Sequence, residues 1–382
     1  MKCKRNNLGK ITTLITTYKR PEYLYRAISS VLNQSYKNLE IHVFDDASGD
    51  ETENTVQNIM REDDRLQYYC HPINMGMLKN VQSAIASVDT PYFSLLSDDE
   101  LLTPNMYQDA IEIFNAHPTV MFVILNTISI DDKDNLIGNR ESTGNLTVCC
   151  GDSRFETWHT SNIPRVITSI LFKKELAQIF LNISGIDIGF DIRIMLIAAA
   201  KFDYAYLSKV GGIFTHHANS FSAGKSNFNL PHHVIQVSRY TDIFYMQDVS
   251  QVIKDSCIYY IRKKLFHNGL AGLYEVLKRS IKNICINEDL DQIGNKEIKD
   301  ARYSGYRYTA LILKYFYFNK VIKAVLRLLF QKYYYKKRFK HQAYMKSLQE
   351  GVYKELFEYI KIIGNQSGPI QMQNTSARVK WS

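Results

Sequence analysis

This 382-residue chain has few cysteines, and none of them lies in a recognisable cysteine motif. The six cysteines are scattered, with no CxxC pair and no Cys/His spacing typical of a zinc site. Only Cys149 and Cys150 are adjacent, and neighbouring cysteines do not easily bridge to each other. The pattern argues against a disulfide framework and favours reduced thiols in a cytoplasmic protein.

Long apolar runs are also missing from the sequence. No stretch of about 18 uncharged apolar residues occurs, which argues against a transmembrane helix. The charged N-terminal residues are not followed by an apolar core long enough for a signal peptide. We therefore expect a cytoplasmic protein without a membrane span.

The composition is that of a globular protein with an excess of positive charge. Hydrophobic residues make up 45% of the chain and charged residues 22%, and the length allows two domains or one domain with an appendage. The formal net charge of +9 favours an anionic partner, such as nucleotide phosphates, a membrane surface or nucleic acid. Because no helix-turn-helix, zinc or RNA-recognition signature accompanies the charge, a nucleic-acid-binding protein is the weakest of these alternatives.

Strand-like and helix-like segments alternate over residues 11–126. This alternation predicts an α/β fold with a mostly parallel central sheet and helices on both faces. Right-handed crossovers would place the loops that follow the strands at one edge of the sheet. The predicted strands are 11–17, 39–44, 66–70, 92–96 and 120–125, and the predicted helices are 22–34, 51–60, 77–88 and 104–116. Further along, 167–172 reads as a strand and 192–200 as an apolar helix.

Two adjacent carboxylates, Asp98 and Asp99, come directly after the predicted buried strand 92–96. Open α/β sheets bind their ligands at the carboxyl ends of the strands. A divalent cation prefers carboxylate oxygen and is readily shared with phosphates, so the pair indicates a cation bound to a diphosphate. The alternative is an acidic turn that caps the following helix, which Thr103-Pro104 would open.

Polar residues follow the other predicted strands as well. Thr16 and Tyr18 follow the first strand and could hold a base by hydrogen bonding and stacking, and Asp46 follows the second. After the third strand, Gly76 allows close approach of the backbone, and Lys79 could meet phosphate. Together these loops outline a nucleotide-shaped crevice.

Residues 11–52, ITTLITTYKRPEYLYRAISSVLNQSYKNLEIHVFDDASGDET, resemble the opening of the family 2 glycosyltransferases. The order and spacing of the motifs match, and the likeness extends over residues 10–225. The resemblance implies a GT-A (Rossmann-like) fold. It also implies inverting transfer of a sugar from a nucleotide diphosphate, with Mg²⁺ or Mn²⁺ as cofactor.

The resemblance assigns roles to individual residues. Thr16, Tyr18 and Asp46 fall on the nucleoside-contact positions of the family. Asp99 falls on the expected metal ligand, and Asp98 is placed to contact ribose or a water on the metal.

Two positions depart from the family pattern. Ser97 stands where the family's Asp-x-Asp motif has its first Asp, and Lys19 replaces the commoner Asn. The loss of a carboxylate at Ser97 bears directly on metal affinity.

An inverting transfer also needs a base that takes the proton of the acceptor hydroxyl. In the family this base is an acidic residue at the start of a late helix, which here is Asp191, with Asp187 as the second choice. The alternative for Asp191 is a helix N-cap, a position that Asp favours.

A pair of histidines resembles the family's His-x-x-Ser-x-Ser segment. His217 matches the family histidine, which can reach the metal or the diphosphate. From an extended segment, His216 and His217 cannot both point into one site, and the alternative is a pair of surface histidines.

The C-terminal part is expected to be mainly α-helical and basic. Residues 308–340 hold nine Lys or Arg residues and no acid, which is typical of an amphipathic helix on an anionic membrane surface or of an ordinary helix with a solvated basic face. We predict a catalytic domain at 1–225, a basic helical region at 226–363 that can attach peripherally to the inner face of the membrane, and a flexible tail at 364–382.

The sequence therefore predicts an inverting glycosyltransferase that uses a nucleotide-diphosphate sugar, with a UDP-sugar favoured. A glycan or lipid-linked acceptor in cell-surface polysaccharide assembly is expected. Because Ser97 replaces an acid, a nucleotide-sugar-binding module without turnover is the main alternative. A nucleotidyltransferase would need a glycine-rich loop after the first strand, and Thr16–Pro21 contains no glycine.

Overall fold

The computed structural model describes residues 9–139, 143–161, 163–164, 166–183, 190–217, 239–240, 243–260 and 343–365. The chain divides into two compact units. One comprises Met1–Asn227 with Gln342–Ser382, and the other comprises Phe228–His341, of which the described residues 251–260 are helical. The basic segment 308–340 and most of the predicted tail lie outside the described residues.

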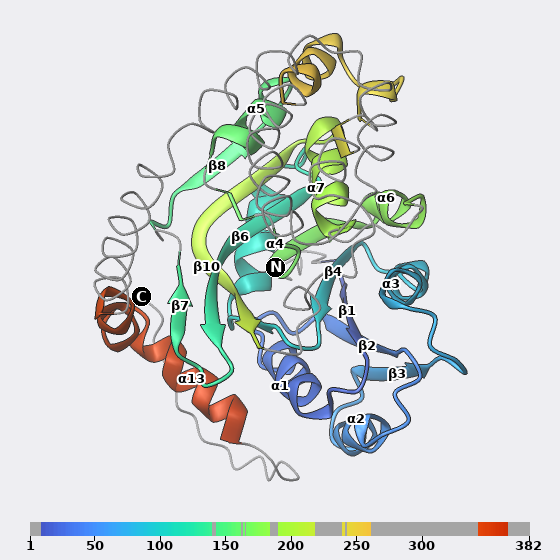
Figure 1. Cartoon of the computed structure of the whole chain (residues 1–382), viewed down its shortest axis with the longest axis vertical. Coiled ribbons are helices and arrows are strands. Elements are labelled where there is room, and N and C mark those ends of the chain that lie inside the picture. The colour runs from blue at the N-terminus through green and yellow to red at the C-terminus, as the bar shows by residue number, and fades with distance from the viewer. Residues whose placement is uncertain are drawn as a thin grey trace, which may run out of the picture. The chain divides into compact units, whose positions relative to one another are not determined.

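The first unit is built on one sheet of ten strands (Figure 1). Most of the expected strands lie within a few residues of their predicted bounds. The strands are β1 (Ile11–Thr17), β2 (Leu39–Asp45), β3 (Leu66–Cys70), β4 (Tyr92–Ser97), β5 (Leu101–Leu102), β6 (Phe122–Asp131), β7 (Leu136–Gly138), β8 (Leu146–Cys149), β9 (Ile170–Lys173) and β10 (Tyr204–His216). The α/β fold class predicted from the sequence is confirmed.

The strand order along the sheet is β3-β2-β1-β4-β9-β6-β10-β5. β1 runs parallel to β2 and β4, and β2 runs parallel to β3. β9 is antiparallel to both of its neighbours, β4 and β6, while β10 is parallel to β6. Because β9 is antiparallel to both β4 and β6, the strands β4 and β6 run in the same direction. The carboxyl ends of β1, β2, β4, β6 and β10 therefore all lie at the same edge of the sheet.

Helices cover both faces of this sheet (Figure 1). In β1 the side chains of Ile11 and Ile15 share a core with α1, α2 and α4, while α3 packs against β1 and β2 outside that core. The alternation along the strand separates these two layers. Among the described residues of the first unit, the helices include α1 (Pro21–Leu32), α2 (Thr52–Met60), α3 (Met77–Ala86), α4 (Met106–Ala116), α5 (Ser153–Thr160), α6 (Ala177–Leu181), α7 (Phe190–Lys201) and α13 (Lys354–Asn365), with a 3-10 turn at Lys174–Leu176.

The sequence analysis did not predict β10, the longest strand. Its ladder with β6 is irregular between Leu207 and Gly212, which breaks the two-residue period. A Cβ atom at Gly211 would lie 2.4 Å from Cβ of Leu125, so only glycine allows the two strands to approach this closely.

The C-terminal helix α13 packs on the same unit as the sheet. Phe357 and Ile360 are buried in a cluster with Leu101 of β5 and Ile213 of β10. Just ahead of α13, the Gln349 side chain accepts from Leu136 N at 3.1 Å. Residues that the sequence analysis placed in a separate helical region thus complete the core beside β5. No helix in the described ranges combines the length and apolar composition that crossing a bilayer requires.

Truncation of α13 at its buried face tests this packing. We expect Phe357→Ala to lower the free energy of unfolding by about 3–5 kcal/mol, because it leaves a cavity in the cluster. The control is Ile362→Ala, since Ile362 lies on the same helix with 55% of its surface exposed and should change stability by less than about 0.5 kcal/mol. Urea denaturation of the full chain measures both, and equal effects would contradict the packing.

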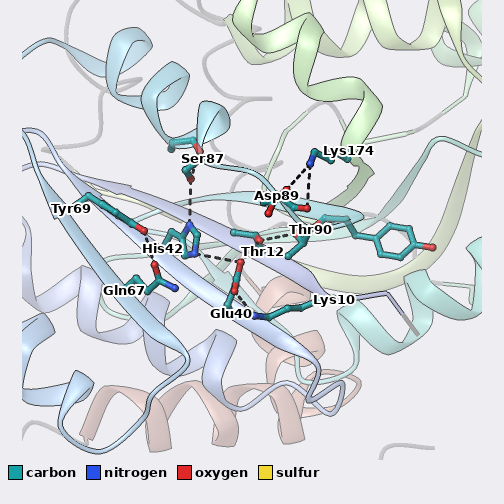
Figure 2. A network of polar contacts seen from close by, with 12 residues as sticks. Lys10, Thr12, Glu40, His42, Gln67, Tyr69, Ser87, Asp89, Thr90 and Lys174 are labelled. Atoms are coloured by element: carbon teal, nitrogen blue, oxygen red, sulfur yellow. Dashed lines mark hydrogen bonds and ion pairs between the residues drawn. The ribbon is translucent and has the colours of Figure 1, made fainter. Parts of the chain in front are cut away.

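A polar network joins the starts of β1, β2 and β4 at the opposite edge of the sheet (Figure 2). Glu40 forms an ion pair with Lys10 and accepts a hydrogen bond from Thr12 Oγ1 at 2.8 Å. The hydroxyls of Thr12 and Thr90 are 2.6 Å apart. These contacts fix the amino-terminal ends of three adjacent strands.

His42 lies buried beside this network on β2 (Figure 2). Its Nδ1 is 3.3 Å from Ser87 Oγ, and its Nε2 is 3.4 Å from Glu40 Oε1. Burial lowers the pKa of the imidazole, and it outweighs the opposing charge of Glu40. The neutral form is therefore the one that the fold accommodates.

This burial has a consequence for stability at low pH. Because the pKa of His42 is lower in the folded state, the unfolded chain binds more protons as the pH falls through about 6.5. Wild type should therefore lose more stability than His42→Gln between about pH 7.5 and pH 5.5, by at most about 1.4 kcal/mol per pH unit. Urea titrations at the two pH values check the difference, and parallel losses would show that His42 does not titrate with unfolding.

Candidate functional site

The candidate site lies at the carboxyl edge of the sheet, where several strands end together. Thr17 is the last residue of β1, Ser97 of β4 and His216 of β10. The residues that follow these strand ends, Asp98 and His217 among them, are therefore brought to one rim although they are far apart in the sequence.

Asp98 is buried, with 2% of its surface exposed. Both oxygens of its carboxylate accept hydrogen bonds from the end of β1 and from the loop between β1 and α1, which we call the first loop. Its Oδ2 accepts from Thr17 Oγ1 at 2.8 Å and from Tyr18 N at 3.3 Å, and its Oδ1 accepts from Arg20 Nη1 at 3.0 Å. Burial raises the pKa of this carboxyl to about 6, against the lowering effect of the Arg20 charge. Asp98 thus ties the end of β4 to the loop between β1 and α1.

Asp99 is the point at which three segments meet. Its Oδ2 accepts from Arg20 Nη1 at 2.9 Å and lies 3.0 Å from Nε2 of His217. The His217 ring is buried and stacks on Tyr23 of α1, with centroids 4.6 Å apart and an angle of 19° between the planes. The neighbouring His216 is exposed, so one histidine of the pair faces the acids, as the sequence analysis expected of an extended segment.

Glu100 is buried immediately behind Asp99. Burial raises the pKa of its carboxyl to about 8, and the charges of Asp99 and Asp191 raise it further. Asp191 therefore lies within electrostatic reach of the acid-bearing turn. It is the second residue of α7, inside the helix rather than at its N-cap position. Asp187 lies outside the described residues.

Asp46 uses its carboxylate to close a loop. Its Oδ1 accepts from Met75 N at 2.6 Å and its Oδ2 from Gly76 N at 2.9 Å. Gly76 has a φ of 84°, a conformation that favours glycine, and it directly precedes α3. Lys79 is exposed on the first turn of that helix. Asp46 thereby ties the loop that carries Lys79 to the carboxyl end of β2.

A second tie runs from Asp45 to the first loop. Ser48 Oγ donates to Asp45 Oδ1 at 2.5 Å and accepts from Lys19 N at 2.8 Å. Lys19 has a φ of 56°, in the left-handed region that Asn occupies more readily than Lys. This geometry accounts for the commoner Asn at this position of the family pattern.

The two predicted base-contact residues lie beside these ties. Thr16 is half-buried near the end of β1, and 42% of the surface of Tyr18 is exposed. Lys19 Nζ lies 5.2 Å from the centre of the Tyr18 ring. The Tyr18 ring is thus accessible for stacking with a flat ligand at the rim.

Several residues at this rim were not predicted from the sequence. Arg20, Tyr23 and Glu100 all contact or surround Asp99, and Asp45 orders the first loop. Arg20 and Tyr23 stand close to the predicted Tyr18 in the chain, and Glu100 follows Asp99, so proximity in sequence was the available signal. What these side chains touch depends on the strand order.

Asp99 and His217 bring together two atoms that can serve as ligands of a cation. A carboxylate oxygen and an imidazole nitrogen face each other there. Within the described ranges, no group of three or more His, Cys, Asp or Glu side chains is arranged to hold a metal ion. Two protein ligands suit a cation that takes its remaining ligands from phosphate oxygens and water.

Because Glu100 is buried, we expect the free energy of unfolding to fall as the pH rises. Between the unfolded pKa of about 4.3 and the folded pKa of about 8, the folded state keeps a proton that the unfolded state releases. Glu100→Gln removes this difference in proton binding. Its free energy of unfolding should therefore rise relative to that of wild type by up to about 1.4 kcal/mol per pH unit over that interval. Urea denaturation at about pH 5 and pH 8 measures the gain, and a pH-independent difference would refute it.

Residues 12–186 match the protein-family model described as Glycosyl transferase family 2. The match begins within β1 and includes the acids that follow β4. It ends before α7, so Asp191 and His217 lie beyond the matched residues.

Curated relatives match parts of the chain as well. An uncharacterized glycosyltransferase of Haemophilus influenzae is 26% identical over 142 residues, which are 37% of this chain and 44% of the relative. The GalNAc(5)-diNAcBac-PP-undecaprenol beta-1,3-glucosyltransferase of Campylobacter jejuni is 34% identical over 96 residues, which are 25% of this chain and 31% of the relative. The chain thus spans less than half of the length of either relative.

A solved structure shares the fold. The crystal structure of S. aureus TarS 1-349 in complex with UDP-GlcNAc superposes with a TM-score of 0.54 and 14% sequence identity, covering 68% of this chain and 73% of that one. At this identity the likeness concerns the fold alone, and it confirms the GT-A architecture expected from the sequence.

Proposed function

We propose that the protein is an inverting glycosyltransferase that uses a nucleotide-diphosphate sugar, because residues 12–186 match the family 2 glycosyltransferase model. The observation that carries the proposal is the meeting of Asp98, Asp99 and His217 at the carboxyl edge of the sheet. Folding alone gives little reason to bury adjacent acids there, because burial disfavours their charged forms. A divalent cation held beside these acids would offset that cost.

We propose a UDP-sugar as the donor. The accessible Tyr18 ring and the half-buried Thr16 suit a base, and the loop closed by Asp46 presents Lys79 to a diphosphate. The complex of TarS with UDP-GlcNAc supports a nucleotide sugar as the ligand class for this fold. Asp98 would orient the ribose by exchanging one of its present contacts with the first loop for a ribose hydroxyl.

The proposed cofactor is Mg²⁺ or Mn²⁺, which Asp99 and His217 would hold together with the diphosphate. When bound, such a cation neutralises the negative charge that develops on the leaving diphosphate. Ser97 leaves one carboxylate fewer than the family motif, and the imidazole of His217 supplies the second protein ligand.

Asp191 is the proposed general base. In an inverting transfer the acceptor oxygen forms a bond to the anomeric carbon while the bond from that carbon to the diphosphate oxygen breaks. The proton of the attacking hydroxyl passes to a carboxylate. Asp191 on α7 lies near the acids that follow β4, as its influence on Glu100 indicates. A base at this place can act on the face of the sugar opposite the diphosphate.

The proposed acceptor is a glycan or a lipid-linked glycan in cell-surface polysaccharide assembly. The net charge of +9 favours an anionic lipid carrier or membrane surface over a neutral partner. The name of the Campylobacter jejuni relative includes a -PP-undecaprenol carrier, which supports an acceptor of this class.

A thermal-shift panel tests the donor and the cofactor. UDP-, GDP-, dTDP- and CMP-sugars are added to the full chain with and without Mn²⁺, because a ligand that binds only the folded state raises the melting temperature. We expect a UDP-sugar to give the largest shift and Mn²⁺ to increase it. If none of the nucleotide sugars raises the melting temperature, the proposal is refuted.

A variant of the base separates binding from transfer. Asp191→Asn should bind the selected donor as wild type does but lower transfer by roughly 10²–10⁴-fold, because the proton acceptor is lost. Asp109→Asn is the control, since Asp109 of α4 forms an ion pair with Lys209 and takes no part in the site. Calorimetry with donor and Mn²⁺, and release of UDP with free and lipid-linked acceptors, give the two readouts. Near-normal transfer by Asp191→Asn would remove the assignment, and binding by wild type without any transfer would favour a binding module.

A further inference from the structure

Arg20 places a positive charge directly on the two acids of the site. Its Nη1 donates to Asp98 Oδ1 at 3.0 Å and to Asp99 Oδ2 at 2.9 Å. The side chains of Asp98 and Asp99 are 3% and 11% exposed, whereas 22% of the Arg20 side chain remains exposed. The side chain of Arg20 is thus the most exposed of the three.

The oxygen that Arg20 contacts is the same one that faces His217. Asp99 Oδ2 lies 2.9 Å from Arg20 Nη1 and 3.0 Å from His217 Nε2. A cation that bound between this oxygen and His217 would share the oxygen with the guanidinium. Two positive groups on one partly buried carboxylate oxygen repel each other strongly, because little water lies between them to screen the charges.

Arg20 lies at the start of α1, where its side chain can move while its backbone stays in place. It is the N-cap residue of α1, outside the helix, and it directly precedes Pro21. Rotation of its side chain alone can move the guanidinium away from Asp99. At the same rim a diphosphate would offer it several anionic oxygens, which the planar guanidinium binds in pairs.

We propose that Arg20 is a built-in competitor of the metal ion, which holds Asp99 until a nucleotide diphosphate arrives and then transfers to the diphosphate. This inference rests on the proposed function and deepens it. The cation binds weakly to the empty site and tightly once the diphosphate has drawn Arg20 away. Cation and donor are then positively coupled, so each raises the affinity of the site for the other.

The test is the binding of Mn²⁺ alone to the full chain, measured by the electron paramagnetic resonance signal of free Mn²⁺. Arg20→Gln removes the competing charge and should bind Mn²⁺ roughly tenfold more tightly than wild type. The matched control is Arg26→Gln, since Arg26 lies on α1, the helix that Arg20 precedes, and forms an ion pair with Asp134 at 2.7 Å. Because it removes an equal charge without freeing Asp99, its Mn²⁺ affinity should stay within about twofold of wild type.

A second titration measures the coupling. In wild type, saturating UDP should tighten Mn²⁺ binding by roughly tenfold or more, and in Arg20→Gln this gain should largely disappear while UDP itself binds more weakly. Arg20→Lys keeps the charge without the planar fork. It should bind Mn²⁺ alone as wild type does but show reduced coupling to UDP.

A merely structural salt bridge would behave differently. Arg20→Gln would then bind Mn²⁺ no better than wild type, or more weakly, and such a result overturns the inference. If Arg20→Gln does not fold, as judged by its melting curve, Arg20→Lys decides instead, and unchanged coupling in that variant also overturns it. Failure of wild type to bind Mn²⁺ and any nucleotide sugar together would count against the proposed function, whereas failure of the Arg20 variants alone counts only against this inference.

Discussion

The site depends on how two adjacent, largely buried carboxylates are compensated. Asp98 and Asp99 follow a buried strand, where the loss of water disfavours their charges. The fold supplies donors from two directions, with Arg20 and Thr17 from the end of the first strand and His217 from the end of β10. Each donor stands on or beside a strand end, so its position is set by the sheet. A different strand order would separate the acids from these partners.

The direction of the strands beyond β4 depends on β9, a short strand that is antiparallel to both of its neighbours. Its two antiparallel ladders turn β6 and β10 into the same direction as β4. The carboxyl end of β10 therefore meets the acids, which a reversed β10 would leave at the opposite edge. Close packing of β10 at Gly211 against Leu125 keeps this part of the sheet together.

The C-terminal helix supports the same region from behind. Leu101 follows the acids by two residues and lies in one cluster with Phe357 and Ile360 of α13. The acid-bearing turn is therefore held between its charged partners at the rim and an apolar cluster on the other side. Residues outside the family match thus contribute to the environment of the proposed site.

Local patterns in the sequence were sufficient for most strands, most helices and the residues at the strand ends. Apolar periods and short polar loops are local properties, so the succession of parallel strands and the acids after β4 could be named from the chain alone, whereas His217 was named from the resemblance to the family. Long-range pairing decided the rest. The irregular β10, the closure of a loop by Asp46, the burial of Glu100 and the hold of Arg20 on Asp99 all depend on which distant segments become neighbours. A linear pattern carries no record of such contacts, because the strand order that creates them emerges only when the whole sheet forms.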